Sequence, residues 1–295
     1  MGKTVAVTGI GAHTRFTGLM MSIWPLAPDF WTSTMHETNV LTLALRLARQ
    51  AGDLIAQQRK QLSIRYKGGT ELVTQADVAA DELITAGIRK NYPSHTILSE
   101  EINPQELTDA EHLWIIDPID GTVNYAHHHP QVAVSIAYYH QGQARVGVVH
   151  NPFTDETFHA QRGKGARLND LPIRVANTDE LKRAIVATGF PYVRDDLPLL
   201  MRRLETTLTH CADIRRNGSA ALDICWVACG RLDAYYESVQ VWDFAAAQLI
   251  AREAGAKVGH IFPLPEDVNP ELHASDLLIS NPALFTPLQS LLEQA

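Results

Sequence analysis

Cysteine, long apolar runs and clustered positive charge are all scarce in this chain. The three cysteines lie in one stretch and are odd in number, which indicates reduced thiols of a cytoplasmic protein rather than a disulfide framework (Cys211, Cys225 and Cys229). No apolar run reaches the roughly 18 residues that a membrane span needs, and the segment after Lys3 lacks the apolar core of a signal peptide. The net charge of −8 and the lack of a Lys/Arg block argue against direct nucleic-acid binding.

The composition is that of a folded protein, with 45% hydrophobic and 20% charged residues among 295. Only the first 35 residues lack an orderly pattern. Val5–Gly11 resembles a strand that runs into a dinucleotide loop, but Thr14 occupies the position of the third glycine of that fingerprint. We therefore interpret residues 1–35 as an N-terminal extension, which is either an accessory strand or a loose tail. A third possibility is that synthesis starts at Met35, in which case residues 1–34 are not translated.

Apolar periodicity predicts the order of helices and strands. Residues 40–55 and about 74–90 have helical spacing, with Thr38 or Asn39 as the N-cap of the first helix. Strand-like runs follow at 96–99, 113–116, 132–139, 145–149 and 156–161. Beyond a polar stretch, strands at 185–188, 232–236 and 277–280 alternate with helices at 197–208, 220–228, 244–254 and 282–293. The pattern predicts an α/β protein with an N-terminal α+β part at 36–180 and a C-terminal α/β part at 181–295.

The strongest chemical signal is an apolar strand that ends in two carboxylates, Asp117 and Asp120, followed by Gly121 and Thr122. Hard oxygen ligands of this kind suit Mg²⁺ better than metals that prefer thiols or imidazoles. Glu100 follows another strand-like run, and Asp243 begins a helix. Each acid alone is typical of a cap or a solvated strand end. Gathering all of them without a metal would be costly, so a cluster of them implies divalent cations.

Four segments together resemble motifs of the inositol monophosphatase family, in matching order and spacing: 72–77, 99–101, 117–122 and 242–255. Arg215–Asp223 is most similar to the bacterial SuhB-like branch of that family. The resemblance implies a layered αβαβα sugar-phosphatase-like fold and a lithium-sensitive, Mg²⁺-dependent phosphatase that forms a homodimer. Two departures from the family pattern are Ser99, where glycine is frequent, and Ala256, which replaces a second glycine.

The resemblance also implies roles for individual residues. Two or three Mg²⁺ ions would be held by Glu100, Asp117, the Ile119 carbonyl, Asp120 and Asp243. Asp77 and Thr122, with Glu100, would orient and deprotonate the attacking water. The Gly121 and Thr122 amides would bind phosphate, and the alcohol would face Gly218, Ser219, Ala220 and Glu237. The loop at Lys67 would be a mobile flap.

The resemblance implies inositol 1-phosphate as the leading substrate, hydrolysed by direct attack of water. Related enzymes accept fructose 1,6-bisphosphate, histidinol phosphate or phosphoadenosine nucleotides. The resemblance also leaves open a regulatory role as a binding partner in a transcription antitermination complex. Retention of every candidate metal ligand favours catalysis.

Competing motifs fail on spacing. A haloacid dehalogenase-type motif would place its nucleophile at Pro118. Ser219 lacks the second glycine of G-x-S-x-G, so it is predicted to start a helix. The adjacent imidazoles of His127–His129 predict a solvated loop rather than a metal site, and Arg162–Gly165 predicts a hairpin turn.

Overall fold

The computed structural model describes residues 1–2, 28–61, 64–67, 71–101, 110–190 and 197–295. The α-helices there are α1 (Pro28–Gln58), α2 (Gln75–Asn91), α3 (Thr122–Ala126), α4 (Leu197–His210), α5 (Ala220–Ala228), α6 (Val241–Glu253) and α7 (Pro282–Glu293). Short 3₁₀ helices cover Arg59–Gln61 and Leu181–Arg183. The strands are β1 (Ile64–Lys67), β2 (Glu71–Thr74), β3 (Thr96–Ser99), β4 (His112–Asp120), β5 (Ala133–His140), β6 (Gln143–Asn151), β7 (Glu156–Gln161), β8 (Ala166–Leu168), β9 (Leu171–Pro172), β10 (Ile185–Thr188), β11 (Asp213–Arg215), β12 (Ala234–Glu237), β13 (Lys257–His260) and β14 (Leu277–Ser280).

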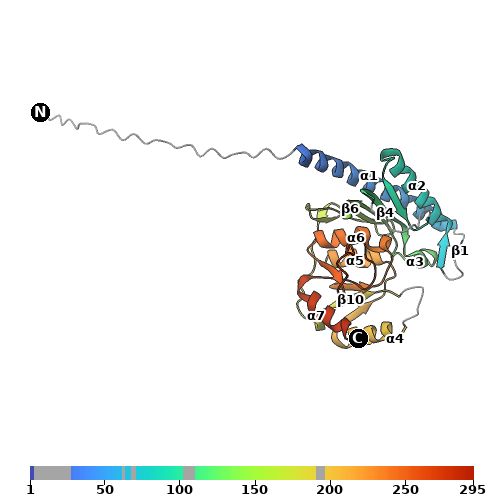
Figure 1. Ribbon diagram of the computed structural model, residues 1–295, viewed down its shortest axis with the longest axis vertical. Helices are drawn as coiled ribbons and strands as arrows, with labels where there is room; N and C mark the ends of the chain where they lie inside the picture. The colour runs from blue at the N-terminus through green and yellow to red at the C-terminus, as the bar shows by residue number, and fades with distance from the viewer. Residues whose placement is uncertain (3–27, 62–63, 68–70, 102–109, 191–196) are drawn as a thin grey trace.

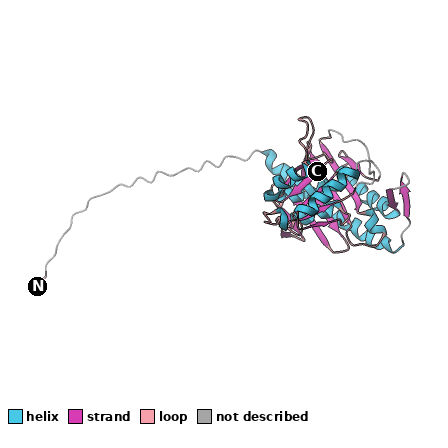
Figure 2. Ribbon diagram, turned by 90° about the horizontal axis from the view of Figure 1, so that it is seen from below, coloured by secondary structure: helices cyan, strands magenta, loops and turns pink. Residues whose placement is uncertain are grey.

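These elements form five layers, as the predicted αβαβα fold requires. Figure 1 shows α1 and α2 on one side of the sheet that contains β4 and β6, with α5 and α6 on its other side. The sheet that contains β10 follows, and α4 and α7 cover its outer face. From below, the helices of this outer layer lie in front of the strands, close to the C-terminus (Figure 2). Each of these two sheets thus has helices on both faces, as buried sheets require.

The larger sheet has the order β3-β4-β5-β6-β7-β8-β9 and is antiparallel except for the β3–β4 pair. Alternate residues of its strands enter two different cores because side chains alternate across a strand. Trp114 and Ile116 pack in the core beneath α1 and α2. Ile115 and Tyr139 point to the opposite core, which contains much of α5 and α6. β4 is therefore buried on both faces, and its continuous apolar run reflects this burial.

The smaller sheet has the order β11-β10-β12-β14-β13, in which β10 runs parallel to both its neighbours. Its outer face packs against Leu284 and Leu288 of α7 in a third core. The strands of the two sheets come from 96–172 and 185–280. The division of the chain into parts 36–180 and 181–295 stays a prediction.

The first helix differs from the prediction. It begins at Pro28, so Thr38 and Asn39 lie inside it and neither is its N-cap. Proline is tolerated in a first turn, where its missing N–H leaves no helical bond unmade. Of the predicted extension 1–35, residues 28–35 are helical, and residues 3–27 lie outside the described part.

The apolar pattern of the sequence did not predict some of the short elements. β4 continues past Ile116 to Asp120, and β1 pairs with β2 as a hairpin. The predicted flap at Lys67 falls largely on residues 68–70, which lie outside the described part. Arg162–Gly165 does join two antiparallel strands, β7 and β8, as predicted. In the described part, no helix is long and apolar enough to cross a membrane.

Candidate active site

The C-terminal end of β4 brings two carboxylates together by an irregularity in the sheet. Asp117 pairs with Ser135 of β5, and Asp120 pairs with Ala133, with a shift of register between them. The Asp117 carboxylate accepts a 3.0 Å hydrogen bond from the backbone N–H of Ile119. Two residues that a regular strand would point in opposite directions therefore both line one pocket.

Gly121 makes the turn that ends β4. Its φ of +92° lies in the left-handed region. A Cβ there would lie 2.8 Å from the carbonyl oxygen of Gln131 and 3.0 Å from that of Gly218. Only glycine fits this backbone without strain, and the turn leads directly into α3.

The start of α5 meets Asp120 from a point 100 residues later in the chain. Ser219 caps α5 by accepting from Leu222 N–H, as the helix-start prediction required, and its hydroxyl donates to Asp120. The Asp120 carboxylate also accepts from the N–H groups of Ala221 at 2.8 Å and Ala220 at 3.3 Å. A carboxylate bonded to the positive end of a helix is electrostatically favoured, so Asp120 joins the larger sheet to the middle helical layer.

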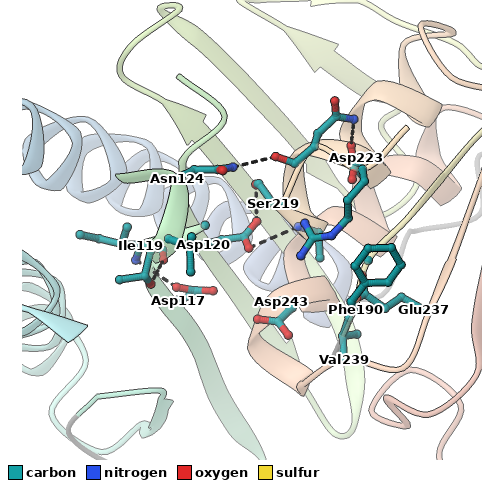
Figure 3. Close-up of a pocket in the computed structure, with 18 of the residues that line it drawn as sticks. Asp117, Ile119, Asp120, Asn124, Phe190, Ser219, Asp223, Glu237, Val239 and Asp243 are labelled. Carbon is teal, nitrogen blue, oxygen red and sulfur yellow. Dashed lines mark hydrogen bonds between the residues drawn. The ribbon is translucent and has the colours of Figure 1, made fainter. Parts of the chain in front are cut away.

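Glu100 and Asp243 complete the acidic pocket from two further elements. Glu100 follows β3, which runs parallel to β4, so both strands end at the same edge of the sheet. Asp243 lies in the first turn of α6, where it accepts from Gln240 N–H at 2.7 Å in a capping box. Oxygen atoms of Asp117, Asp120 and Asp243 all lie within 4.8 Å of one another. Figure 3 shows these three side chains around one opening, which Glu100 also lines.

The pocket makes ionisation of its acids costly. Burial, followed by repulsion between neighbouring carboxylates, raises the pKa of Glu100, Asp117 and Asp243 well above their usual range. For Asp120 burial raises the pKa to about 6, although the donors from Ser219 and Ala221 oppose that rise. Among the described residues that line this 400 Å³ cavity there are six carboxylates and one guanidinium, that of Arg216.

This donor set fits a bound hard cation. Carboxylate oxygens, together with the nearby Ile119 carbonyl, are the ligands that Mg²⁺ prefers. Divalent charge would offset the repulsion and burial that raise the carboxyl pKa values. The residues that we predicted as metal ligands from the sequence thus line one cavity (Glu100, Asp117, Ile119, Asp120 and Asp243).

Asp77 and Thr122 lie beside the acidic pocket and contact each other. Asp77 belongs to the capping box of α2, where its carboxylate accepts from Thr74 N–H at 2.8 Å. The Thr122 hydroxyl lies 3.4 Å from the other Asp77 oxygen and 3.1 Å from the Ile119 carbonyl. Burial raises the pKa of Asp77 to about 6. The pair predicted from the resemblance is therefore adjacent, across 45 residues of chain.

The opposite wall of the cavity is formed by the C-terminal half. Gly218, Ser219, Ala220 and Glu237 all line it, as the resemblance implied. Glu237 accepts from the Tyr235 hydroxyl at 2.7 Å, and burial raises its pKa to about 7.

Sequence reasoning missed several residues of this wall, among them Phe190, Arg216 and Asp223. The Arg216 guanidinium lies 5.2 Å from the centre of the Phe190 ring. The buried carboxylate of Asp223 accepts from the Asn217 side chain at 2.6 Å, and burial raises its pKa to about 8. Arg216 and Asp223 belong to the segment 215–223, whose charged residues were an available signal. Phe190 offered none.

The predicted loop His127–His129 follows α3 and is exposed, as expected for a solvated loop. Its main chain is held from inside the molecule. The Arg59 guanidinium donates to the carbonyls of Tyr125 and Asn124 at 3.0 and 3.1 Å, and also to the carbonyl of His129. Arg59 thereby anchors the segment that follows the Gly121 turn.

A five-layer fold with a carboxylate-lined pocket at a strand end defines a layered sugar-phosphatase-like protein. The model of the inositol monophosphatase family matches residues 36–292, so the chain belongs to that family. It is 44% identical to the Nus factor SuhB of Pasteurella multocida over 224 residues, which are 74% of this chain and 84% of that protein.

Solved structures agree with this assignment. The extragenic suppressor protein suhB of Bartonella henselae is 33% identical, with a TM-score of 0.79 over 87% of this chain and 99% of that chain. The inositol monophosphatase of Anabaena is 35% identical, with a TM-score of 0.77 over 88% of this chain and 96% of that chain.

Proposed function

We propose that the chain is a Mg²⁺-dependent phosphatase that hydrolyses small phosphate monoesters, with inositol 1-phosphate as the preferred substrate. The observation that carries the proposal is the convergence of Asp117, Asp120 and Asp243, from separate parts of the chain, on one pocket that also contains Glu100. Membership of the inositol monophosphatase family supports the reaction class.

The proposed chemistry needs no nucleophilic side chain. When bound, two or three Mg²⁺ ions would neutralise phosphate charge and lower the pKa of a bound water. Glu100, Asp117, Asp120, Asp243 and the Ile119 carbonyl would hold them.

Thr122 and Asp77 would position and deprotonate the attacking water. A Thr122 hydroxyl that donates to Asp77 has a lone pair free to accept from water, and the proton would pass through the hydroxyl to Asp77. Its pKa of about 6 leaves Asp77 ionised at neutral pH and able to accept that proton. The Gly121 and Thr122 amides would hold the phosphate while water attacks in line.

The alcohol part of the substrate would contact the second wall of the cavity. Gly218, Ser219 and Ala220 lie where β4 meets α5, and the Glu237 carboxylate can accept hydrogen bonds from sugar or polyol hydroxyl groups. Such a wall supports a substrate whose alcohol part carries several hydroxyl groups, as a polyol phosphate does, over histidinol phosphate.

The decisive test is phosphate release from inositol 1-phosphate and from fructose 1,6-bisphosphate, histidinol phosphate and phosphoadenosine nucleotides, each with and without Mg²⁺. We expect activity that requires Mg²⁺, is highest with inositol 1-phosphate and is lost in Asp117→Asn. Activity that persists in EDTA would refute the metal-dependent mechanism. Isolation of a phospho-enzyme after rapid quenching would refute direct attack by water.

A second candidate function is a regulatory one, favoured because a close relative carries the name Nus factor. In this reading the chain binds a protein of a transcription antitermination complex, since its net charge of −8 does not favour RNA contact. Equal phosphate release by wild type and Asp117→Asn would leave this as the better proposal. Family membership further supports a cytoplasmic, lithium-sensitive homodimer, which light scattering and inhibition by LiCl would test.

A further inference from the structure

A second cluster of potential metal ligands lies at the opposite end of β4 from the acidic pocket. His112 begins β4 and is paired in register with His140, the last residue of β5. Nitrogen atoms of these two rings and a carboxylate oxygen of Glu111 all lie within 4.8 Å of one another. His112 precedes Asp117 by five residues, about 17 Å along an extended strand, so the two clusters are separate.

The cluster is built on rigid backbone. The N–H of Gln141, which follows His140, donates to the Glu111 carbonyl at 2.8 Å. The two strand ends that carry all three side chains are therefore tied together. The His140 ring lies 3.6 Å from the Glu111 carboxylate, and its centre lies 4.9 Å from that of His112.

The chemistry of the set points to an imidazole-preferring metal. One ring nitrogen of His112, Nδ1, forms a 2.7 Å hydrogen bond with the Tyr138 hydroxyl. The other ring nitrogen is left to act as a metal ligand. A hydrogen bond of this kind typically orients a metal-bound histidine. Burial lowers the pKa of His112, which favours the neutral ring that metals bind.

Two further imidazoles surround the set. His95 stacks on His112 with ring centres 4.4 Å apart, and His36 lies 6.0 Å from His112. Four neighbouring imidazoles repel one another when protonated, so the cluster favours neutral rings. Neutral imidazoles are good ligands for divalent transition metals.

We propose that Glu111, His112 and His140 form a binding site for Zn²⁺, with water as the fourth ligand. Ligand atoms at 2.0–2.1 Å from tetrahedral Zn²⁺ are about 3.3 Å apart. The Glu111 and His140 donors, 3.6 Å apart, are already close to that spacing. Since all the donors lie within 4.8 Å of one another, no pair needs to approach by more than roughly 1.5 Å. The side chains of Glu111 and His140 are 66% and 35% exposed and can rotate to do so. The bound ion would clamp the start of β4 to the end of β5.

The test is a calorimetric titration of the full chain with Zn²⁺. The buffer contains saturating Mg²⁺, which occupies the acidic pocket. We expect one site of micromolar affinity, a rise in melting temperature with Zn²⁺, and visible absorption bands of tetrahedral Co²⁺ as a substitute. His140→Asn, at a half-buried position, and Glu111→Gln, at an exposed one, should each weaken Zn²⁺ binding at least tenfold.

His128→Asn is the matched control because His128 is exposed and its neighbouring imidazoles do not belong to the set. This variant should bind Zn²⁺ as wild type does. Binding that is unchanged in His140→Asn and Glu111→Gln would overturn the proposal. So would Zn²⁺ binding that disappears in Asp117→Asn, which would place the ion in the acidic pocket, or an affinity in the millimolar range.

Discussion

Replacement of Asp117 by asparagine should abolish activity and, at the same time, stabilise the metal-free protein. Asparagine keeps the oxygen that accepts from Ile119 N–H and removes one negative charge from the buried cluster. Asp120 indicates the free energy that such a buried charge costs, because burial raises the pKa of Asp120 from 3.8 to about 6. About two pKa units at 1.36 kcal/mol each amount to about 3 kcal/mol.

The pKa of Asp117 is raised in the same direction, by burial first and then by repulsion from Glu100, Asp120 and Asp243. The sign follows from proton linkage. A carboxyl whose folded pKa lies above its unfolded pKa costs stability as pH rises through that interval, and the full cost remains above it. At pH 7.5 we therefore expect metal-free Asp117→Asn to be more stable than wild type, by an amount on the order of the 3 kcal/mol that Asp120 indicates, or about 5 °C in melting temperature for a chain of this length.

The assay is thermal unfolding by circular dichroism in EDTA and again in Mg²⁺, beside phosphate release from inositol 1-phosphate. Mg²⁺ should raise the melting temperature of wild type much more than that of the variant, whose activity should fall on the order of 100-fold or more. Asp179→Asn removes an exposed carboxylate outside the pocket and should change neither measurement. If metal-free Asp117→Asn melts below wild type while Mg²⁺ shifts both equally, the cluster is neither strained nor a metal site.

Three other predictions concern residues around the cluster. Ser99, just before Glu100, donates a hydrogen bond from its fully buried hydroxyl to Asp81. Ser99→Ala should lower the free energy of unfolding in urea by about 1–2 kcal/mol and raise the Mg²⁺ concentration that gives half-maximal rate, and Ser99→Thr should restore both. An unchanged Mg²⁺ requirement in Ser99→Ala would exclude a positioning role for Ser99. A Cβ at Gly189 would lie 2.0 Å from a Glu237 carboxylate oxygen, so Gly189→Ala should displace the Glu237 side chain. We expect KM for inositol 1-phosphate to rise severalfold with kcat nearly unchanged. A fall in kcat as large as the rise in KM would contradict this. Because Asp77 accepts a proton only when ionised and has a pKa of about 6, kcat should fall tenfold per pH unit below pH 6 in a pH profile, whereas a rate independent of pH from 5 to 7 would rule Asp77 out as the proton acceptor.

Local pattern determined much of this protein. Helical spacing of apolar residues in 74–90 and 282–293 predicted α2 and α7 almost to the residue, because each helix buries one face against a sheet. The apolar run before Asp117 predicted a buried strand, and the acids at its end predicted hard-cation chemistry. Turn residues predicted the hairpin at Arg162–Gly165 for the same local reason.

Only the tertiary structure decided which acids meet and how they are held. Asp120 bonds to the first turn of α5, 100 residues away, and Asp243 reaches the same pocket from α6. Such convergence depends on strand pairing and on the packing of α5 and α6 against both sheets, which local periodicity does not encode. The raised pKa values of Asp120, Asp223 and Glu237 arise from burial in a shared cavity, and burial is a property of the folded chain. Residue types thus determined which ligands are present, and long-range packing determined their positions and charge states.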